Sequence, residues 1–138
     1  MAELDYAFLA DYARVKGNSL DALSIGIDTI DVPDVPFSIQ MVLVLRVQFD
    51  RLDCGNVHRI ETIVQDPDGQ RPAEVHINAQ ATWPDEDPPN GHIHVQILLP
   101  LLIGVTTLGV HAVDVALDGR HLKTIFFTVK RGESAIAS

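Results

Sequence analysis

Apolar and polar residues alternate one by one along several stretches of this chain. In the longest stretch, Ile39, Leu43 and Phe49 share one parity, whereas Gln40 and Arg46 share the other. Successive side chains of a strand point to opposite faces, so this alternation predicts strands with one buried face. Together with runs of β-branched residues, the pattern predicts eight strands, at residues 4–16, 25–32, 39–49, 59–65, 74–83, 92–99, 113–117 and 125–129.

Turn-forming residues separate the predicted strands. Asp118-Gly119 lies between two alternating runs and is typical of a two-residue hairpin, because both turn residues need positive φ. Residues 4–16 also fit one face of a helix, but Gly17-Asn18 and the stretch at 25–32 favour a strand with a hairpin partner. The sequence therefore predicts an all-β fold, an antiparallel eight-stranded β-sandwich of Greek-key type, immunoglobulin-like or C2-like, with a closed barrel as the alternative. We expect one domain at 1–131 and a flexible tail at 132–138.

The apolar parity of each strand also predicts the core. We expect these residues to be buried together: Leu43, Leu45, Val47, Ile77, Trp83, Val95, Val113, Val115 and Phe127.

The charge balance narrows the classes of partner. The 138 residues include 19 acidic and 10 basic ones, a net charge of −9, and apart from Lys130-Arg131 the basic residues are scattered singly. Nucleic acids and anionic membranes attract clustered Lys and Arg, so neither is an expected partner. A cationic partner or a metal fits better, although a negative surface also serves solubility alone.

Cysteine content and the N-terminal residues suggest a compartment. Cys54 is the only cysteine, so no internal disulfide can form, which agrees with a reducing environment. The first residues lack the basic start and apolar run of a secretory signal. The longest apolar run, 97–105, contains Pro100 and Gly104 and is too short for a membrane helix. We therefore expect a cytoplasmic protein.

Several short motifs resemble those of a known family. They are Leu9-Ala10-Asp11-Tyr12-Ala13-Arg14, a Gly-Asn turn, Ile25-Gly26-Ile27-Asp28-Thr29-Ile30, Pro36 before the strand at 41–47, Gly109, and Asp118-Gly119. Over nearly the whole chain, this arrangement resembles a family of small bacterial β-sandwich proteins catalogued as a domain of unknown function. The resemblance implies a β-sandwich fold and a bacterial intracellular setting, and it implies no activity or site residue.

Two groups of residues could hold a metal. Antiparallel strands place alternate loops at opposite ends of a domain, so His58, His92, His94 and His121 should lie near one end, with Cys54. A zinc or copper site there is one possibility, and outward-facing surface histidines are the other. Asp31, Asp34, Asp66 and Asp68 should gather at the opposite end, where they would bind calcium or serve simple turn chemistry.

Catalytic motifs do not emerge from the sequence. It has no Gly-x-Ser-x-Gly elbow, no phosphate-binding glycine loop and no Cys-x-x-Cys pair. Cys54, four residues before His58, is either a reactive thiol or a small loop residue. The sequence therefore favours a protein that is not an enzyme and has no cofactor, unless one of the metal sites is real.

Surplus apolar residues favour an interaction role. Five of them have the parity opposite to the core of their strands: Val42, Val44, Leu98, Leu122 and Phe126. Something must cover them, and we expect an interface between two copies or with another protein. The leading hypothesis is a non-enzymatic, self-associating interaction module. The alternatives are a small-ligand or metal-binding protein that uses the histidine-rich end, and calcium-dependent recognition.

Overall fold

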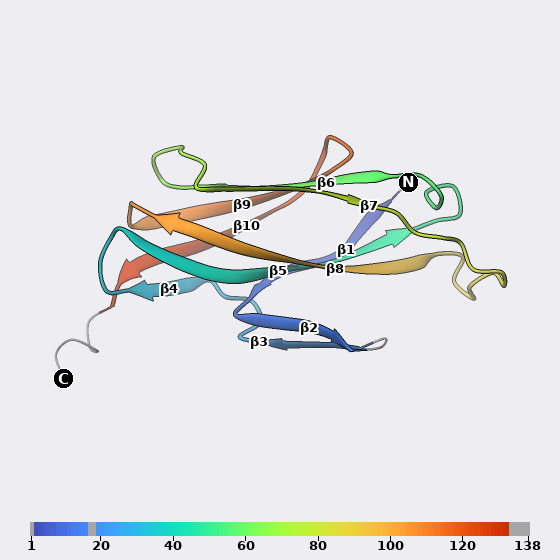
Figure 1. Ribbon diagram of the computed structural model, residues 1–138, viewed down its shortest axis with the longest axis horizontal. Helices are drawn as coiled ribbons and strands as arrows, with labels where there is room; N and C mark the ends of the chain where they lie inside the picture. Colours follow the sequence, from blue (N-terminus) through green and yellow to red (C-terminus); the bar gives the residue numbers. More distant parts are fainter. Residues whose placement is uncertain (1, 17–18, 133–138) are drawn as a thin grey trace.

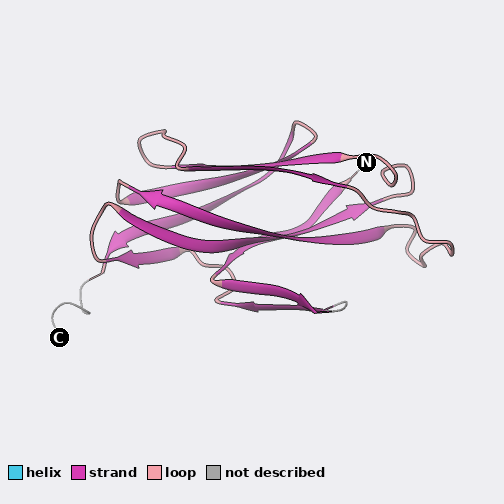
Figure 2. Ribbon diagram, in the orientation of Figure 1, coloured by secondary structure: helices cyan, strands magenta, loops and turns pink. Residues whose placement is uncertain are grey.

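A computed structural model describes residues 2–16 and 19–132, and within these ranges the chain forms strands and loops without a helix (Figure 2). The all-β class is thereby confirmed. The tail expected at 132–138, apart from Gly132, and the Gly17-Asn18 turn lie outside the described residues. The strands are β1 (Glu3–Ala10), β2 (Tyr12–Lys16), β3 (Ser19–Leu23), β4 (Thr29–Val32), β5 (Phe37–Phe49), β6 (His58–Gln65), β7 (Ala73–Ala79), β8 (Ile93–Val105), β9 (Gly109–Leu117) and β10 (Arg120–Arg131).

The strands form three sheets (Figure 1). One has three strands in the order β1-β5-β8, another has five in the order β4-β10-β9-β6-β7, and β2 and β3 form a separate hairpin. All pairs are antiparallel except β4 with β10, which are parallel. The prediction of eight antiparallel strands was therefore wrong in the number of strands and in this one pairing.

The core lies between the three-stranded and the five-stranded sheets. The inward residues of β5 predicted from the alternation are buried, with Leu43 and Leu45 at 0% exposure. Of the nine residues predicted to be buried together, Ile77 and Val95 are only partly buried against the core because they lie on edge strands. Trp83 was assigned to the core wrongly. It follows the end of β7, is partly exposed, and its indole N–H donates to the Asp87 carboxylate.

The N-terminal segment does not form one long strand. The chain bends at Asp11, leaves the three-stranded sheet and returns after a short hairpin. Backbone bonds from Asp11 N–H to Leu23 O and from Gly26 N–H to Leu9 O join the two ends of this excursion. The prediction of a hairpin between 4–16 and 25–32 is therefore wrong. β2 pairs with β3, whereas β4 pairs with β10 at the edge of the five-stranded sheet.

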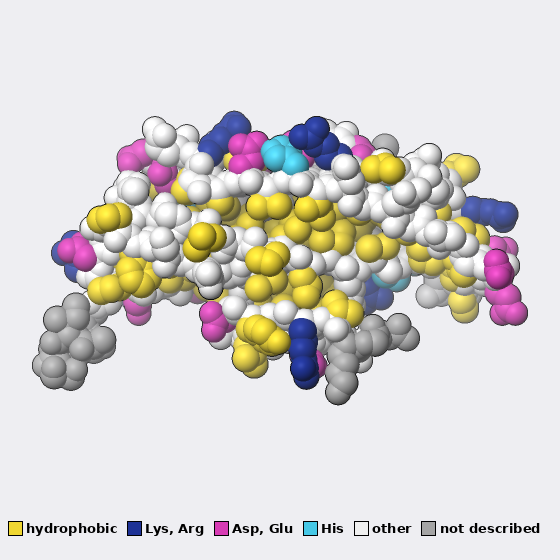
Figure 3. All heavy atoms as spheres, in the orientation of Figure 1, with side chains coloured by type: hydrophobic (Ala, Val, Ile, Leu, Met, Phe, Trp, Pro, Cys, Tyr) yellow, Lys and Arg dark blue, Asp and Glu magenta, His cyan; other side chains and the backbone are white. Residues whose placement is uncertain are grey.

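The two open sides between the large sheets differ. On one side, Arg120 and Lys123 of β10 donate hydrogen bonds to the backbone oxygens of Ala2 and Ala7, beside or within β1. On the other side, β7 and β8 lie next to each other and belong to different sheets. Figure 3 shows apolar side chains across the middle of this second side. Long basic side chains thus bond to backbone oxygens at the β1–β10 side.

Candidate functional site

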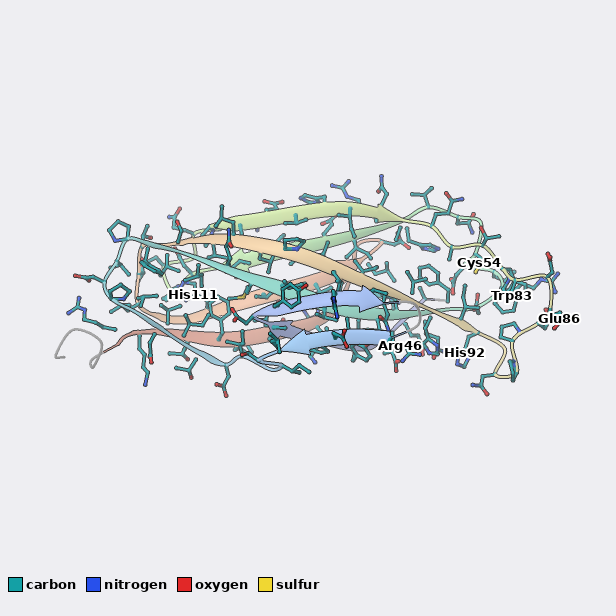
Figure 4. All side chains as sticks on the ribbon, turned by 60° about the horizontal axis from the view of Figure 1, so that its bottom comes forward. Arg46, Cys54, Trp83, Glu86, His92 and His111 are labelled. Atoms are coloured by element: carbon teal, nitrogen blue, oxygen red, sulfur yellow. The ribbon has the colours of Figure 1, made fainter. Side chains whose placement is uncertain are left out.

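The β2–β3 hairpin lies over the outer face of the three-stranded sheet (Figures 1 and 4). β2 contacts both β5 and β8. Val44, on the outer side of β5, is 0% exposed, whereas Val42 and Leu98 are partly buried. The cover that these surplus apolar residues require therefore comes, at least in part, from within the same chain.

Large apolar side chains remain exposed around this hairpin. Tyr12 is 51% exposed, and Leu23, Ile25 and Leu102 are each 62% exposed. Tyr12 and Leu23 are directly paired across the hairpin, with Ile25 two residues farther along. We call these four residues, together with the two hollows that they line, the hairpin surface.

The two hollows make the hairpin surface continuous. A groove of about 320 Å³ between the hairpin and the sheet is lined by Tyr12 with Val42, Pro100 and Leu102. A second, shallower hollow of about 560 Å³ on the hairpin is lined by Tyr12 with Leu23, and Tyr12 is common to both. The surface can thus accept apolar side chains of a partner as well as present its own.

Charged groups on the hairpin surface are few and mostly paired. The guanidinium Nε of Arg14 lies 3.0 Å from Oδ2 of Asp21, across the two strands of the hairpin. Asp11 is the other charged residue lining the hollows. The surface is therefore close to neutral on a chain whose net charge is −9.

The structure does not bring the four predicted histidine ligands together. His92 and His94 lie on or beside β8 in the three-stranded sheet, with ring centroids 5.3 Å apart. His58 and His121 begin β6 and β10 of the other sheet, where β9 separates them. Among residues 2–16 and 19–132, no group of three or more potential ligands is placed to hold a metal. The strand order, which alternation does not reveal, separates these side chains.

His58 instead joins three segments of the chain. Its ring is almost buried, with Nδ1 at 2.7 Å from Oδ2 of Asp118 and Nε2 at 2.7 Å from the backbone oxygen of Asp53. Both partners are acceptors, so the geometry calls for an imidazolium with two N–H donors. Burial by itself would lower the pKa of His58, but the Asp53 carbonyl and the Asp118 carboxylate outweigh burial and raise this pKa. The bond to His58 in turn lowers the pKa of Asp118.

The loop aspartates are engaged in local bonds. The Asp66 carboxylate accepts the backbone N–H groups of Asp68 and Gln70, and Asp68 accepts the Thr107 hydroxyl. At the β4–β10 edge, Asp31 lies 3.8 Å from Lys130 and Asp34 lies 2.8 Å from Arg131. The bonds of Asp66 correspond to the turn chemistry that was the alternative to calcium binding, whereas the ion pairs of Asp31 and Asp34 were not expected.

Cys54 is not activated. Burial raises the pKa of its thiol, and the nearby carboxylates of Asp53 and Asp50 raise it further. A nucleophilic cysteine needs the opposite, an environment that stabilises the thiolate. His58 is also committed to its two acceptors.

The five residues predicted as an interface do not form one surface. Val42, Val44 and Leu98 lie on the outer face of the three-stranded sheet, beneath or beside the hairpin. Phe126 is 61% exposed but lies on β10, in the five-stranded sheet. The outward assignment of Leu122 was wrong, because a bulge between His121 and Lys123 changes the alternation there and Leu122 packs against the core.

Most of the hairpin surface escaped sequence reasoning. Leu102 was covered only by the apolar run at 97–105, and Tyr12 was assigned to a single long strand. The signal available was the Gly17-Asn18 pair, six residues after Asp11, since so short a separation indicates a short hairpin.

The fold and this surface together define a small all-β protein that carries a partly exposed apolar hairpin on one sheet. Within the described part of the chain, no helix is long and apolar enough to cross a membrane. The chain belongs to a family of unknown function (DUF6941), whose family model matches residues 5–130. This match confirms the resemblance to an unknown-function family. None of the curated proteins compared with the chain matches it.

Proposed function

We propose that this chain is a non-enzymatic protein-interaction module and that the hairpin surface binds its partner. The observation that carries the proposal is the exposure, at 51 to 62%, of four large apolar side chains around two adjoining hollows. A contiguous exposed apolar patch with polar surroundings is typical of protein–protein contact sites. Tyr12, shared by both hollows, is also of a residue type enriched at interface hot spots.

The bonds of the polar candidates support an interaction role over a catalytic or metal-dependent one. His58 holds two acceptors, Asp66 holds two backbone N–H groups, and the thiol of Cys54 is kept protonated by a raised pKa. Each group has a structural role that accounts for its position. The four exposed apolar side chains, by contrast, stay half or more open to solvent among residues 2–16 and 19–132.

We also infer the scaffold and setting of this module. The scaffold is a modified β-sandwich of Greek-key type: two large sheets face each other across one core, and the chain crosses between them after β4, β5, β7 and β8. A single cysteine in an acidic chain fits a reducing bacterial cytoplasm. We infer that self-association is the form of this interaction.

Site-specific photo-crosslinking tests the proposed function without knowledge of the partner. In the test protein, expressed in its native host, the photoreactive residue p-benzoylphenylalanine replaces Leu23. In the matched control it replaces Phe126, whose side chain is 61% exposed against 62% for Leu23. We expect a light-dependent protein adduct from position 23 and not from position 126. No adduct at position 23, or equal adducts at both positions, would contradict the proposal.

A further inference from the structure

We propose that the occupant of the hairpin surface is a second copy of this chain, bound through the same surface on both copies. This inference rests on the proposed function and adds the identity of the partner. It follows from the distribution of charge, from the condition of the sheet edges and from the presence of both exposed apolar side chains and a groove on the hairpin surface.

Charge restricts where two copies can meet. Each copy carries 19 acidic and 10 basic residues, so contact between acidic faces would be repulsive. The side chains that line the two hollows carry only three charges, from Asp11, Arg14 and Asp21, and the last two form an ion pair. The hairpin surface therefore has a net charge of about −1, a small fraction of the total.

The same distribution argues against a partner chosen for positive charge. Such a partner would be drawn to exposed acidic segments, for example the loop that holds Asp85, Glu86 and Asp87. Glu86 lies at one end of the molecule, away from the hairpin (Figure 4). A surface that is apolar and nearly neutral suits a partner that is equally apolar and nearly neutral there, and an identical surface meets this condition.

Edge-to-edge pairing of strands is the other common way for copies of a β protein to join, and two features oppose it at the three-stranded sheet, which carries the hairpin. Pro100 lies in the middle of β8, the longer edge strand of its sheet, and proline cannot donate a ladder hydrogen bond. At the other edge of that sheet, Lys123 of β10 bonds to the backbone oxygen of Ala7 in β1. Contact through side chains of the hairpin surface meets neither obstacle.

A two-fold contact requires that one surface carry both of its complementary features. On the hairpin surface, the side chains of Leu23 and Ile25 line the shallower, more open hollow and, at 62% exposure each, are available for insertion into a partner. The groove lined by Val42, Pro100 and Leu102 is the complementary feature. Leu23 or Ile25 of each copy would enter the groove of the other, so that each apolar contact is made twice.

Sedimentation analysis of the purified full chain over micromolar concentrations tests this pairing. We expect a dimer of two 15.1 kDa chains that tightens with added salt, because salt screens the repulsion between two acidic copies. Leu23→Lys should weaken dimerisation by roughly tenfold or more, as loss of an interface hot spot does. The matched variant Phe126→Lys, at equal exposure on the other large sheet, should leave dimerisation unchanged. Unaltered thermal unfolding of both variants, measured at a concentration at which the wild-type chain is also a monomer, shows that the folded chain is being compared.

The outcomes separate this inference from the function on which it rests. A wild-type monomer at all concentrations, or a dimer that Leu23→Lys leaves unchanged, would overturn the second-copy proposal. If the chain is a monomer but position 23 still crosslinks to a protein of another mass, only the identity of the partner is wrong. If it is a monomer and position 23 gives no adduct, the proposed function also fails.

Discussion

Replacing His58 with glutamine should destabilise the fold, and by an amount that depends on pH. The ring of His58 ties the start of β6 to Asp53 of the preceding loop and to Asp118 of the β9–β10 turn, with both distances at 2.7 Å. Glutamine can place its amide N–H near the position of Nε2, but it has no donor at the position of Nδ1 and carries no charge, so it cannot reproduce both bonds. The loss should appear in the free energy of unfolding.

The size of the effect follows from the surroundings of the two bonds. The bond to the Asp53 carbonyl is buried and charge-assisted, and such bonds contribute about 1.5–3 kcal/mol. The Asp118 side chain is 49% exposed, so solvent screening limits its ion pair to about 1 kcal/mol or less. At pH 6 we therefore expect His58→Gln to cost about 2–4 kcal/mol.

The sign of the pH dependence follows from the raised pKa of His58. Burial acts to lower this pKa, but the hydrogen bonds to Asp53 and Asp118 and the charges of both aspartates raise it above its ordinary value of 6.5. The folded state thus holds the proton more tightly than the unfolded state, so the stabilisation is complete below pH 6.5. It is lost as pH rises through the folded-state pKa, where a neutral ring would face an acceptor with an unprotonated nitrogen.

Urea unfolding of the wild-type chain and of His58→Gln at pH 6 and pH 9 measures this difference directly. The difference in free energy of unfolding between the two proteins should be larger at pH 6 than at pH 9. Asp118→Asn is the matched variant, because asparagine keeps an acceptor for Arg59 N–H and tolerates the positive φ of 51° while removing the charge beside His58. It should reduce the pH dependence without abolishing it. A difference in free energy of unfolding that is the same at both pH values, or larger at pH 9, would refute the assignment of His58 as a stabilising imidazolium.

Three further predictions concern the core and the turns. Leu45→Ala removes a fully buried side chain of the central strand and should cost about 2–5 kcal/mol in chemical denaturation; a cost below about 1 kcal/mol would contradict its place in the core. Gly119→Val should destabilise the fold by about 1–3 kcal/mol through backbone strain at φ 81°. A steric clash adds nothing to this cost, because a Cβ at this position meets no atom within 4 Å. Gly119→Asn should cost less, because asparagine adopts positive φ more readily. Asp66→Ala should cost about 1–2 kcal/mol by leaving two backbone N–H groups without their acceptor. The wild-type chain and this variant should each have the same melting temperature in calcium as in chelator. A melting temperature that calcium raises in the wild-type chain only would restore the calcium hypothesis.

Local chemistry was predictable wherever a residue's role depends on its neighbours in the chain. The alternation at 39–49 placed Leu43 and Leu45 in the core, because a strand has only two faces. Asp118 and Gly119 have φ values of 51° and 81°, which confirms the two-residue hairpin that their side chains favour. The membership of an unknown-function family was also visible in short motifs.

Features that depend on lateral order or on interrupted pairing could not be predicted in this way. Alternation does not reveal which strands are neighbours, and so it could not show that β9 separates His58 from His121 or that Phe126 and Val44 belong to different sheets. A bulge at Leu122 reverses the parity from which its outward position was inferred. The covering of Val44 and the exposure of Leu23 both arise because backbone bonds at Leu9 and Asp11 let the chain leave one sheet and place a hairpin upon it. Periodicity records which side of a strand a residue occupies, whereas long-range packing of the chain determines what lies on that side.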